Sequence, residues 1–220
     1  IAVQVYPRDT SGAWIYSTED LLTDEMIEDY RAKYSSSILG IAMSDTVGNG
    51  AIGHRHEENK VSVMGVNDEY ATGATGQQVD LARGRFVNES DLQRGRTVAV
   101  IAESLAEKLF GAQDPIGKDI KIDLTGLVNG RKTFTVIGTY REQASSFLMG
   151  SAGETTTVYI PLTTGYSMQG TNPEGYTYFY VAAAGDIDYQ AFAQETAEYF
   201  NDRYYARNES MYVMTQSMDS

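Results

Sequence analysis

The order of predicted elements near the two chain ends is the feature that most restricts the fold. Near the C-terminus, aromatic and β-branched residues predict strands at 176–183 and 211–215, with a helix at 188–205 between them. A continuous stripe along one face of this helix would pack on a sheet, so the segment predicts a β–α–β unit. The stripe comprises Tyr189, Phe192, Ala193, Thr196, Tyr199 and Phe200.

The N-terminal section predicts the same order. A strand is expected at 1–6, followed by a helix that Thr23 caps and that extends to Tyr34. A compact apolar run then predicts a largely buried strand at 37–44. The helix carries its own apolar stripe, which comprises Met26, Ile27, Tyr30 and Tyr34.

The middle of the chain is predicted to be rich in strands. Glycine-rich residues 47–53 and polar residues 54–59 are expected to form a loop between the strand at 37–44 and a strand at 60–66, and this pair of strands predicts a hairpin with a long loop. Residues 67–91 predict turns, a short helix and irregular structure. Further along the chain we expect a helix at 103–110 closed by Gly111, strands at 97–102, 118–124, 132–140 and 156–161, and a small-residue loop at 143–153.

Two β–α–β sections separated by a β-rich segment predict a mixed α/β (α+β) fold, in which one discontinuous subdomain carries an insertion. The two chain ends would then lie close together.

Because the chain starts at Ile1 without an initiator methionine or a charged leader, we interpret it as a fragment excised from a longer protein. Its apolar runs are far shorter than the roughly 20 residues that cross a bilayer.

Composition excludes several classes of function. The 220 residues include 17 Lys and Arg against 30 Asp and Glu, and a net charge of −13 repels phosphate backbones and anionic lipid. Nucleic acid is therefore not an expected partner. The chain has no cysteine, so it has neither disulfides nor thiolate metal sites, which fits an exported bacterial domain.

Two glycine-containing segments resemble nucleotide-binding motifs but lie in the wrong context. Gly48, Gly50 and Gly53 spell G-x-G-x-x-G, yet no helix follows to place its N-terminus at a pyrophosphate. Residues 111–118 resemble a phosphate-binding loop, but Asp119 stands where Ser or Thr is needed, and the segment joins a helix to a strand. We expect both segments to be structural and the domain to hold no cofactor.

Residues able to carry catalysis or metal binding are sparse. His54 and His56 with Glu57 or Glu58 could supply metal ligands, but a polar loop tip explains the same residues. No nucleophile elbow is present. Pairs of carboxylates are the one feature that would suit an extracytoplasmic hydrolase, which we therefore rank third among the possible functions, after the two described below. We therefore expect no catalytic and no metal-binding residues, and substrate-binding residues stay unassigned.

Tyrosine is abundant, with 16 residues. Tyr176, Tyr178 and Tyr180 are expected on one face of a strand, and Tyr204 and Tyr205 near the end of the last helix. Such rings suit a platform for sugar or peptide, but they suit cross-strand packing equally well, which is the default interpretation.

A set of short segments in a fixed order resembles the MacB-type periplasmic core domain of FtsX/MacB-like ABC transporter permeases. The segments cover about a quarter of the chain, and Val158 to Leu162 is similar to that family's closing strand. They read GRF at 84–86, Asp91, VAVIAESLAEKLFG at 98–111, DPIGKDIKI at 114–122 and FTVIG at 134–138.

The resemblance implies two lobes and a mechanical role. A porter-like, membrane-proximal lobe would comprise 1–85 and 176–220, and an inserted β-rich second lobe, Sabre-like, would comprise 86–175. The parent permease would have one membrane helix before this domain and three after it. It would pair with a second permease copy or homologue and would work with a cytoplasmic ABC ATPase and an extracytoplasmic adaptor protein.

From these observations we expect a non-catalytic extracytoplasmic domain at the bacterial cell membrane. It would couple cytoplasmic ATP hydrolysis to efflux or extraction of peptide, drug or lipoprotein cargo. The alternative is an extracytoplasmic ligand- or peptide-binding sensor domain of another membrane protein. The coupling hypothesis predicts flanking membrane segments and no turnover, whereas the sensor hypothesis predicts a saturable ligand for the isolated domain.

Overall fold

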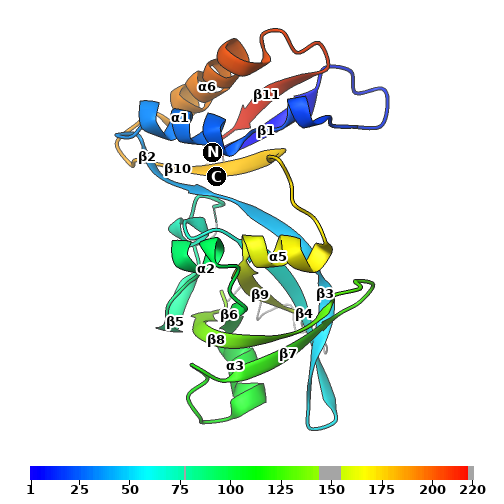
Figure 1. The fold of residues 1–220 in the computed structure, drawn as a ribbon. Helices are drawn as coiled ribbons and strands as arrows, with labels where there is room; N and C mark the ends of the chain where they lie inside the picture. Colours follow the sequence, from blue (N-terminus) through cyan, green and yellow to red (C-terminus); the bar gives the residue numbers. More distant parts are fainter. Residues whose placement is uncertain (77, 144–154, 218–220) are drawn as a thin grey trace. The chain divides into compact units, whose positions relative to one another are not determined.

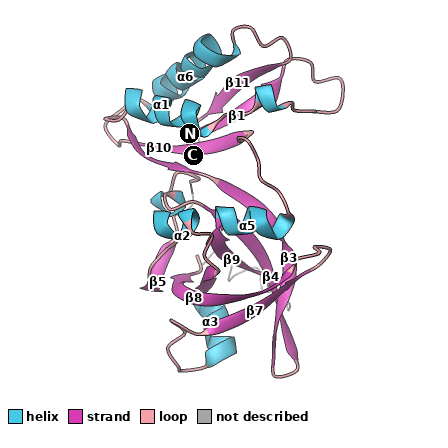
Figure 2. Ribbon diagram, viewed as in Figure 1, coloured by secondary structure: helices cyan, strands magenta, loops and turns pink. Residues whose placement is uncertain are grey.

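The computed structural model describes residues 1–76, 78–143 and 155–217, which form two compact units (Figure 1). Unit 1 comprises Ile1–Met43, Thr72–Gln78 and Pro173–Ser220, and unit 2 comprises Ser44–Ala71 and Val79–Asn172. Both units contain helices and strands (Figure 2), which confirms the predicted mixed α+β fold.

Unit 1 contains the two predicted β–α–β sections in a single antiparallel sheet. The strand order is β11-β1-β10-β2, so each section contributes one central and one edge strand. Helices α1 and α6 cover one face of the sheet (Figure 1). The elements are β1 (Ala2–Pro7), η1 (Thr18–Asp20), α1 (Asp24–Lys33), β2 (Ile38–Ala42), β10 (Tyr178–Ala183), α6 (Tyr189–Phe200), the π-helix η3 (Asn201–Tyr205) and β11 (Met211–Gln216).

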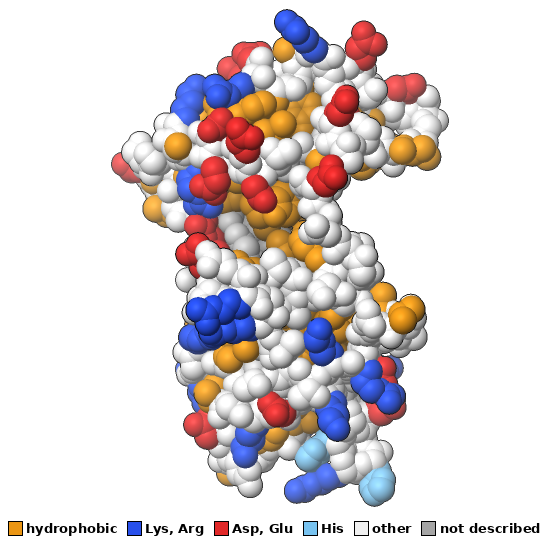
Figure 3. Space-filling model, in the orientation of Figure 1, with side chains coloured by type: hydrophobic (Ala, Val, Ile, Leu, Met, Phe, Trp, Pro, Cys, Tyr) orange, Lys and Arg blue, Asp and Glu red, His pale blue; other side chains and the backbone are white. Residues whose placement is uncertain are grey.

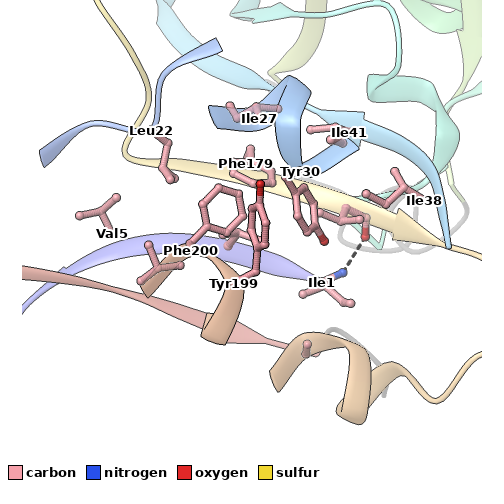
Figure 4. Packing of buried hydrophobic residues seen from close by; sticks show 14 of the residues in the cluster. Ile1, Val5, Leu22, Ile27, Tyr30, Ile38, Ile41, Phe179, Tyr199 and Phe200 are labelled. Carbon is pink, nitrogen blue, oxygen red and sulfur yellow. Dashed lines mark hydrogen bonds between the residues drawn. The ribbon is translucent and has the colours of Figure 1, made fainter. Parts of the chain in front are cut away.

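The core of unit 1 lies between this sheet and its two helices (Figure 4). Side chains alternate between buried and half-buried along β1 and β10, as expected for strands with one covered face. Tyr30 is fully buried, and its hydroxyl forms a 2.8 Å hydrogen bond with the hydroxyl of Thr196. The amino group of Ile1 donates to the carbonyl of Val181 at 2.8 Å. The helix stripes predicted from sequence therefore form this core.

Polar side chains at both ends of α6 form hydrogen bonds with backbone groups. Asp188 accepts hydrogen bonds from the amides of Gln190 and Ala191, and Asn201 begins the π-helix where regular α-helix stops. The Asn201 side-chain amide both donates to the carbonyl of Val213 and accepts from its N–H, each at 2.8 Å. Because β11 is an edge strand, this side chain occupies the position of a neighbouring strand.

Unit 2 is a strand-rich unit whose sheet closes on itself. The order is β5-β8-β6-β9-β4-β3-β7, and β7 pairs again with β8, so β5 alone lies outside the ring. Its elements are β3 (Ser44–His54), β4 (Glu57–Val66), η2 (Tyr70–Thr72), β5 (Asp80–Gly84), α2 (Glu89–Gln93), β6 (Val98–Ala102), α3 (Glu103–Phe110), β7 (Asp119–Leu124), β8 (Arg131–Arg141), β9 (Thr156–Pro161) and α5 (Leu162–Gln169).

The predicted long loop at 47–59 is wrong, and so is the pairing expected across it: the strand predicted at 37–44 is β2, which pairs with β10, and β3 is the hairpin partner of β4. Residues 47–53 continue β3, and the turn to β4 consists of Arg55 and His56, whose φ angles are 47° and 72°. Glycine is needed because β7 passes close by: a Cβ at Gly50 would fall on the carbonyl oxygen of Asp123. Gly50 therefore allows a close strand approach, and Gly48, Gly50 and Gly53 all belong to β3 and not to a loop.

Elsewhere, helices with a strong sequence pattern were predicted correctly, whereas one helix with a weak pattern was missed and another was given the wrong end. Gly111 ends α3 with φ 61°, as expected. Helix α5 was not predicted, and the predicted helix at 188–205 becomes a π-helix after Phe200. The loop at 143–153 lies, apart from Gln143, outside the described residues.

The boundaries of the units differ from the predicted lobes. Unit 1 is built from both chain ends, but residues 44–71 and 79–85, expected in the lobe of 1–85 and 176–220, belong to unit 2. The reason is strand pairing: β4 pairs with β9, and β5 pairs with β8. The hairpin of β3 and β4, which the predicted bounds placed in the porter-like lobe, therefore forms part of the closed sheet.

Candidate functional site

Both glycine segments singled out in the sequence are structural. Gly48, Gly50 and Gly53 lie within β3, and another strand follows them. Residues 111–118 join α3 to β7, and the amide of Gly117 donates to the carbonyl of Val136 at 2.8 Å. Neither segment presents the N-terminus of a helix, so neither forms a phosphate cradle.

His54 and His56 lie at the tip of the β3–β4 hairpin. His54 is the last residue of β3, and His56 is exposed in the turn. Within residues 1–76, 78–143 and 155–217, no group of three or more His, Asp or Glu side chains is arranged to hold a metal ion.

The buried carboxylates of Asp20 and Asp91 hold local turns. Asp91 accepts from the Arg85 guanidinium at 2.6 and 3.2 Å and from the Asn88 amide at 3.1 Å. Burial alone would raise the pKa of Asp91, but these hydrogen bonds and the charges of Arg85 and Arg96 hold it below its ordinary value. Asp20 similarly accepts from the amide of Ser17 at 2.7 Å.

The predicted tyrosine face is only partly assembled. Tyr178 and Tyr180 lie on the sheet face away from α1 and α6, with ring centroids 5.9 Å apart. Tyr176 instead packs against the core, since it is outside β10 and pairs with Leu22. Tyr205 is also a core residue, and its hydroxyl donates to the carbonyl of Asp20 at 2.6 Å.

A cation–aromatic cluster, which the sequence did not reveal, joins α1 to the end of α6. The Lys33 ammonium lies 5.3 Å from the ring centre of Tyr34 and 5.0 Å from that of Tyr199. Arg203 lies over Tyr204 at 5.4 Å and pairs with Asp29 at 3.2 Å. Burial and the charge of Glu195 raise the pKa of Tyr34 to about 12, so its hydroxyl stays protonated at neutral pH.

A pocket of about 370 Å³, here called the Trp14 pocket, lies at the end of the β1–β11 pair where Pro7 is opposite Met211. Trp14 and Ile15 are 43% and 78% exposed, and Tyr6 packs edge-on against Trp14 with centroids 4.7 Å apart. No site was predicted here from the sequence, because the lining comes from segments far apart in the chain. These segments are 7–9, 13–15 and 209–211.

The negative charge of the chain is concentrated in unit 1. Its residue ranges contain 15 Asp and Glu and five Lys and Arg, a net charge of −10 out of the total of −13. Figure 3 shows acidic side chains spread over unit 1 and several basic side chains on unit 2. Unit 1 therefore attracts cationic partners more strongly than unit 2 does.

Membrane-spanning helices were sought in the same described residues. None of the helices there combines the length and the hydropathy needed to cross a bilayer.

The fold defines a class: a two-unit α+β domain with a split β–α–β sheet built from both chain ends and a closed strand-rich unit between them. The family model for the MacB-like periplasmic core domain matches residues 1–199. The chain belongs to this family, as the sequence motifs indicated.

Curated relatives are considerably longer than this chain. It is 30% identical over 138 residues to the macrolide export ATP-binding/permease protein MacB of Bdellovibrio bacteriovorus, covering 62% of the chain and 19% of that protein. It is 26% identical over 121 residues to the MacB of Neisseria gonorrhoeae, covering 55% and 17%. The chain thus spans about a fifth of the length of these relatives.

Solved structures share the fold over nearly the whole chain. The periplasmic region of MacB from Actinobacillus actinomycetemcomitans matches with a TM-score of 0.62 and 15% identity, covering 97% of this chain and 88% of that one. The extracellular domain of the noncanonic ABC-type transporter YknZ from Gram-positive bacteria matches with a TM-score of 0.61 and 19% identity, covering 98% and 100%.

Proposed function

We propose that this chain is the non-catalytic extracytoplasmic domain of a MacB-like ABC transporter permease at the bacterial cell membrane. It couples ATP hydrolysis by a cytoplasmic ATPase to efflux or extraction of peptide, drug or lipoprotein cargo. Its partners are the permease's own membrane helices, a second permease copy or homologue, the ATPase and an extracytoplasmic adaptor. Family membership and the relatives' names, ATP-binding/permease proteins, support the proposal.

The observation that carries the proposal is the pairing of the two ends of the chain. Ala2 lies opposite Gln216, and the β1–β11 register continues without interruption to Pro7 opposite Met211. A displacement applied through either end therefore acts on the same hydrogen-bonded sheet. That sheet carries the aromatic core of Tyr30, Phe179 and Phe200, which makes it a stiff element.

The chain also passes from this sheet to unit 2 with little slack. Strand β2 ends at Ala42 and β3 begins at Ser44, so a single residue, Met43, separates them. Movement of the unit 1 sheet is transmitted directly to the closed sheet of unit 2 along this strand. In this proposal the chain makes and breaks no bonds, and its buried carboxylates Asp20 and Asp91 act as caps.

A spacer experiment tests the coupling. In the full permease reconstituted with its ATPase, a flexible Gly-Ser spacer inserted after Met43 should leave ATP hydrolysis intact and reduce ATP-driven movement of a labelled macrolide by at least about tenfold. The same spacer at Val128, which is fully exposed at 102% in unit 2, is the control and should leave transport unchanged. Transport at the wild-type rate by the Met43 variant would contradict the proposal.

The parent reading frame provides a second test of the permease function. One apolar segment of about 20 residues before Ile1 and three after Ser220 are expected for the permease. A cleavable signal peptide with no later span would instead make coupling to an ATPase impossible.

A further inference from the structure

We propose that the Trp14 pocket binds a lysine or arginine side chain presented by a partner polypeptide. This inference assigns a contact site in unit 1 and does not rest on the transport role. It is drawn from the exposed apolar wall of the pocket, the charges at its rim and the strongly acidic character of the unit around it.

The apolar wall is exposed and held in place. Among the described residues, the large apolar side chains with high exposure are Trp14, Ile15, Leu39 and Val128, and two of these four are adjacent in this pocket. Tyr6 supports the Trp14 ring edge-on, and Tyr6 in turn lies 6.4 Å from Tyr212. Tryptophan presented in this way is typical of residues that dominate the binding energy of interfaces.

The rim charges favour a cation. Asp9 and Glu209 line the pocket, and within the part of the chain that the structure describes neither forms an ion pair. Hydrogen bonds from the Ser11 side chain and from the Ser11 amide, the latter at 2.9 Å, lower the pKa of the Asp9 carboxylate and keep it ionised at neutral pH. Arg8 is the cation of the lining, but its guanidinium donates to the carbonyl of Asn208 at 3.0 Å and lies over Tyr212.

Lysine and arginine side chains can contact both the apolar wall and the acidic rim of this pocket. Their aliphatic stems pack on apolar surface such as Trp14 and Ile15 while the charged head stays near carboxylates or water. A cation over an indole ring is also the strongest form of cation–π contact. The net charge of −10 on unit 1 adds a longer-range attraction for the same partner and repels an acidic one.

Trp14 is the one tryptophan of the chain, so its fluorescence reports directly on the pocket. The 220-residue chain is titrated with a short peptide of alternating leucine and lysine, and with matched peptides that carry glutamate or acetyl-lysine at the lysine positions. We expect a saturable change in Trp14 emission with the lysine peptide. Its dissociation constant should rise at least about fivefold between about 0.02 and about 0.3 M NaCl. The matched peptides should give no such change.

Charge-neutral variants locate the site. Glu209→Gln, alone and with Asp9→Asn, should weaken lysine-peptide binding at least about fivefold. Glu25→Gln removes the same charge from α1 of the same unit and is the matched control, with less than about a twofold effect. Unchanged thermal unfolding of each variant shows that the fold is retained.

Three outcomes would overturn the inference: no saturable change in Trp14 emission, equal binding of the acetyl-lysine peptide, or equal weakening by Glu25→Gln. The last result would mean diffuse attraction to an acidic surface. The titration uses neither membrane nor nucleotide, so a negative titration does not contradict the proposed coupling function. Likewise, a negative spacer experiment does not contradict lysine or arginine binding at the Trp14 pocket.

Discussion

At the scale of single residues, Asp91 is a charged side chain that is both buried and paired. Its carboxylate has no exposed surface, whereas the side chains of its partners Arg85 and Arg96 are 42% and 41% exposed. The carboxylate also completes a capping box with Asn88 at the start of α2. Removing the charge therefore affects an ion pair and a helix start together.

Asp91→Asn should lower the free energy of unfolding by about 2 kcal/mol at pH 7, because a buried pair is broken while the exposed arginines recover hydration. The folded-state pKa lies below the ordinary 3.8, so this stabilisation is present above pH 3.8 and is lost as pH falls through the lower value. Urea unfolding at pH 7 and at acid pH measures both effects.

The matched control for this prediction is Asp123→Asn. It breaks the 2.7 Å pair with Arg131, in which the Asp123 and Arg131 side chains are 55% and 80% exposed, and should cost much less than Asp91→Asn because solvent screens an exposed pair. Equal losses for the two variants would show that burial of Asp91 adds nothing.

Sequence reasoning could name these residues but not pair them. Arg85 and Asp91 belong to the segments that carry the family resemblance, yet their spacing alone does not indicate an ion pair. The Trp14 pocket was missed for a related reason. Residues 7–9 and 209–211 meet there through strand pairing, which no local pattern encodes.

At the scale of elements, the β3–β4 hairpin shows what glycine content can and cannot predict. The pairing of 44–54 with 57–66 agrees with the alternation of Val61 and Val63, but the glycines indicated a loop because they lower strand propensity. The role of Gly50 depends on the proximity of β7, a contact between segments about 70 residues apart. Helix α5 escaped prediction because its stripe is short and includes Gly165, which packs near Val47.

The stability of the β3–β4 hairpin turn can be increased by substitution. Arg55 and His56 both have positive φ, a conformation that favours Asn-Gly. Replacing them together, Arg55→Asn with His56→Gly, should stabilise unit 2 by about 1 kcal/mol, because left-handed backbone is costly for ordinary residues. Chemical denaturation measures the change in the free energy of unfolding of unit 2. The control is Glu58→Asn, which replaces an exposed residue of β4 outside the turn and should not increase this free energy. A loss of stability in the double variant would mean that these side chains form contacts that matter.

At the scale of the whole molecule, the sequence predicted two lobes with one built from both ends, and it misplaced their boundary. The β–α–β patterns are local and were readable, whereas the assignment of 44–71 to unit 2 depends on pairing with β9. The uneven division of charge follows from that corrected boundary.

This charge division predicts different responses of the units to salt. Screening should relieve self-repulsion in unit 1, which carries −10, more than in unit 2, which carries −3. Between about 0.02 and about 0.5 M NaCl, the opening free energy of amides in β10 should rise by about 1 kcal/mol, and that of amides in β6 should rise less. Hydrogen exchange at Phe179 and Ile101 measures the two, and a larger rise at Ile101 would contradict the prediction.

The side-chain amide of Asn201 affects whether copies of the domain can pair through their edge strands. By meeting both backbone groups of Val213, it leaves a fifth strand nothing to bond at the middle of β11, and Asn208 accepts the N–H of Met211 near the start of that strand at 2.7 Å. Copies of the domain at high local concentration are therefore hindered from joining edge to edge through the middle of β11 into fibres.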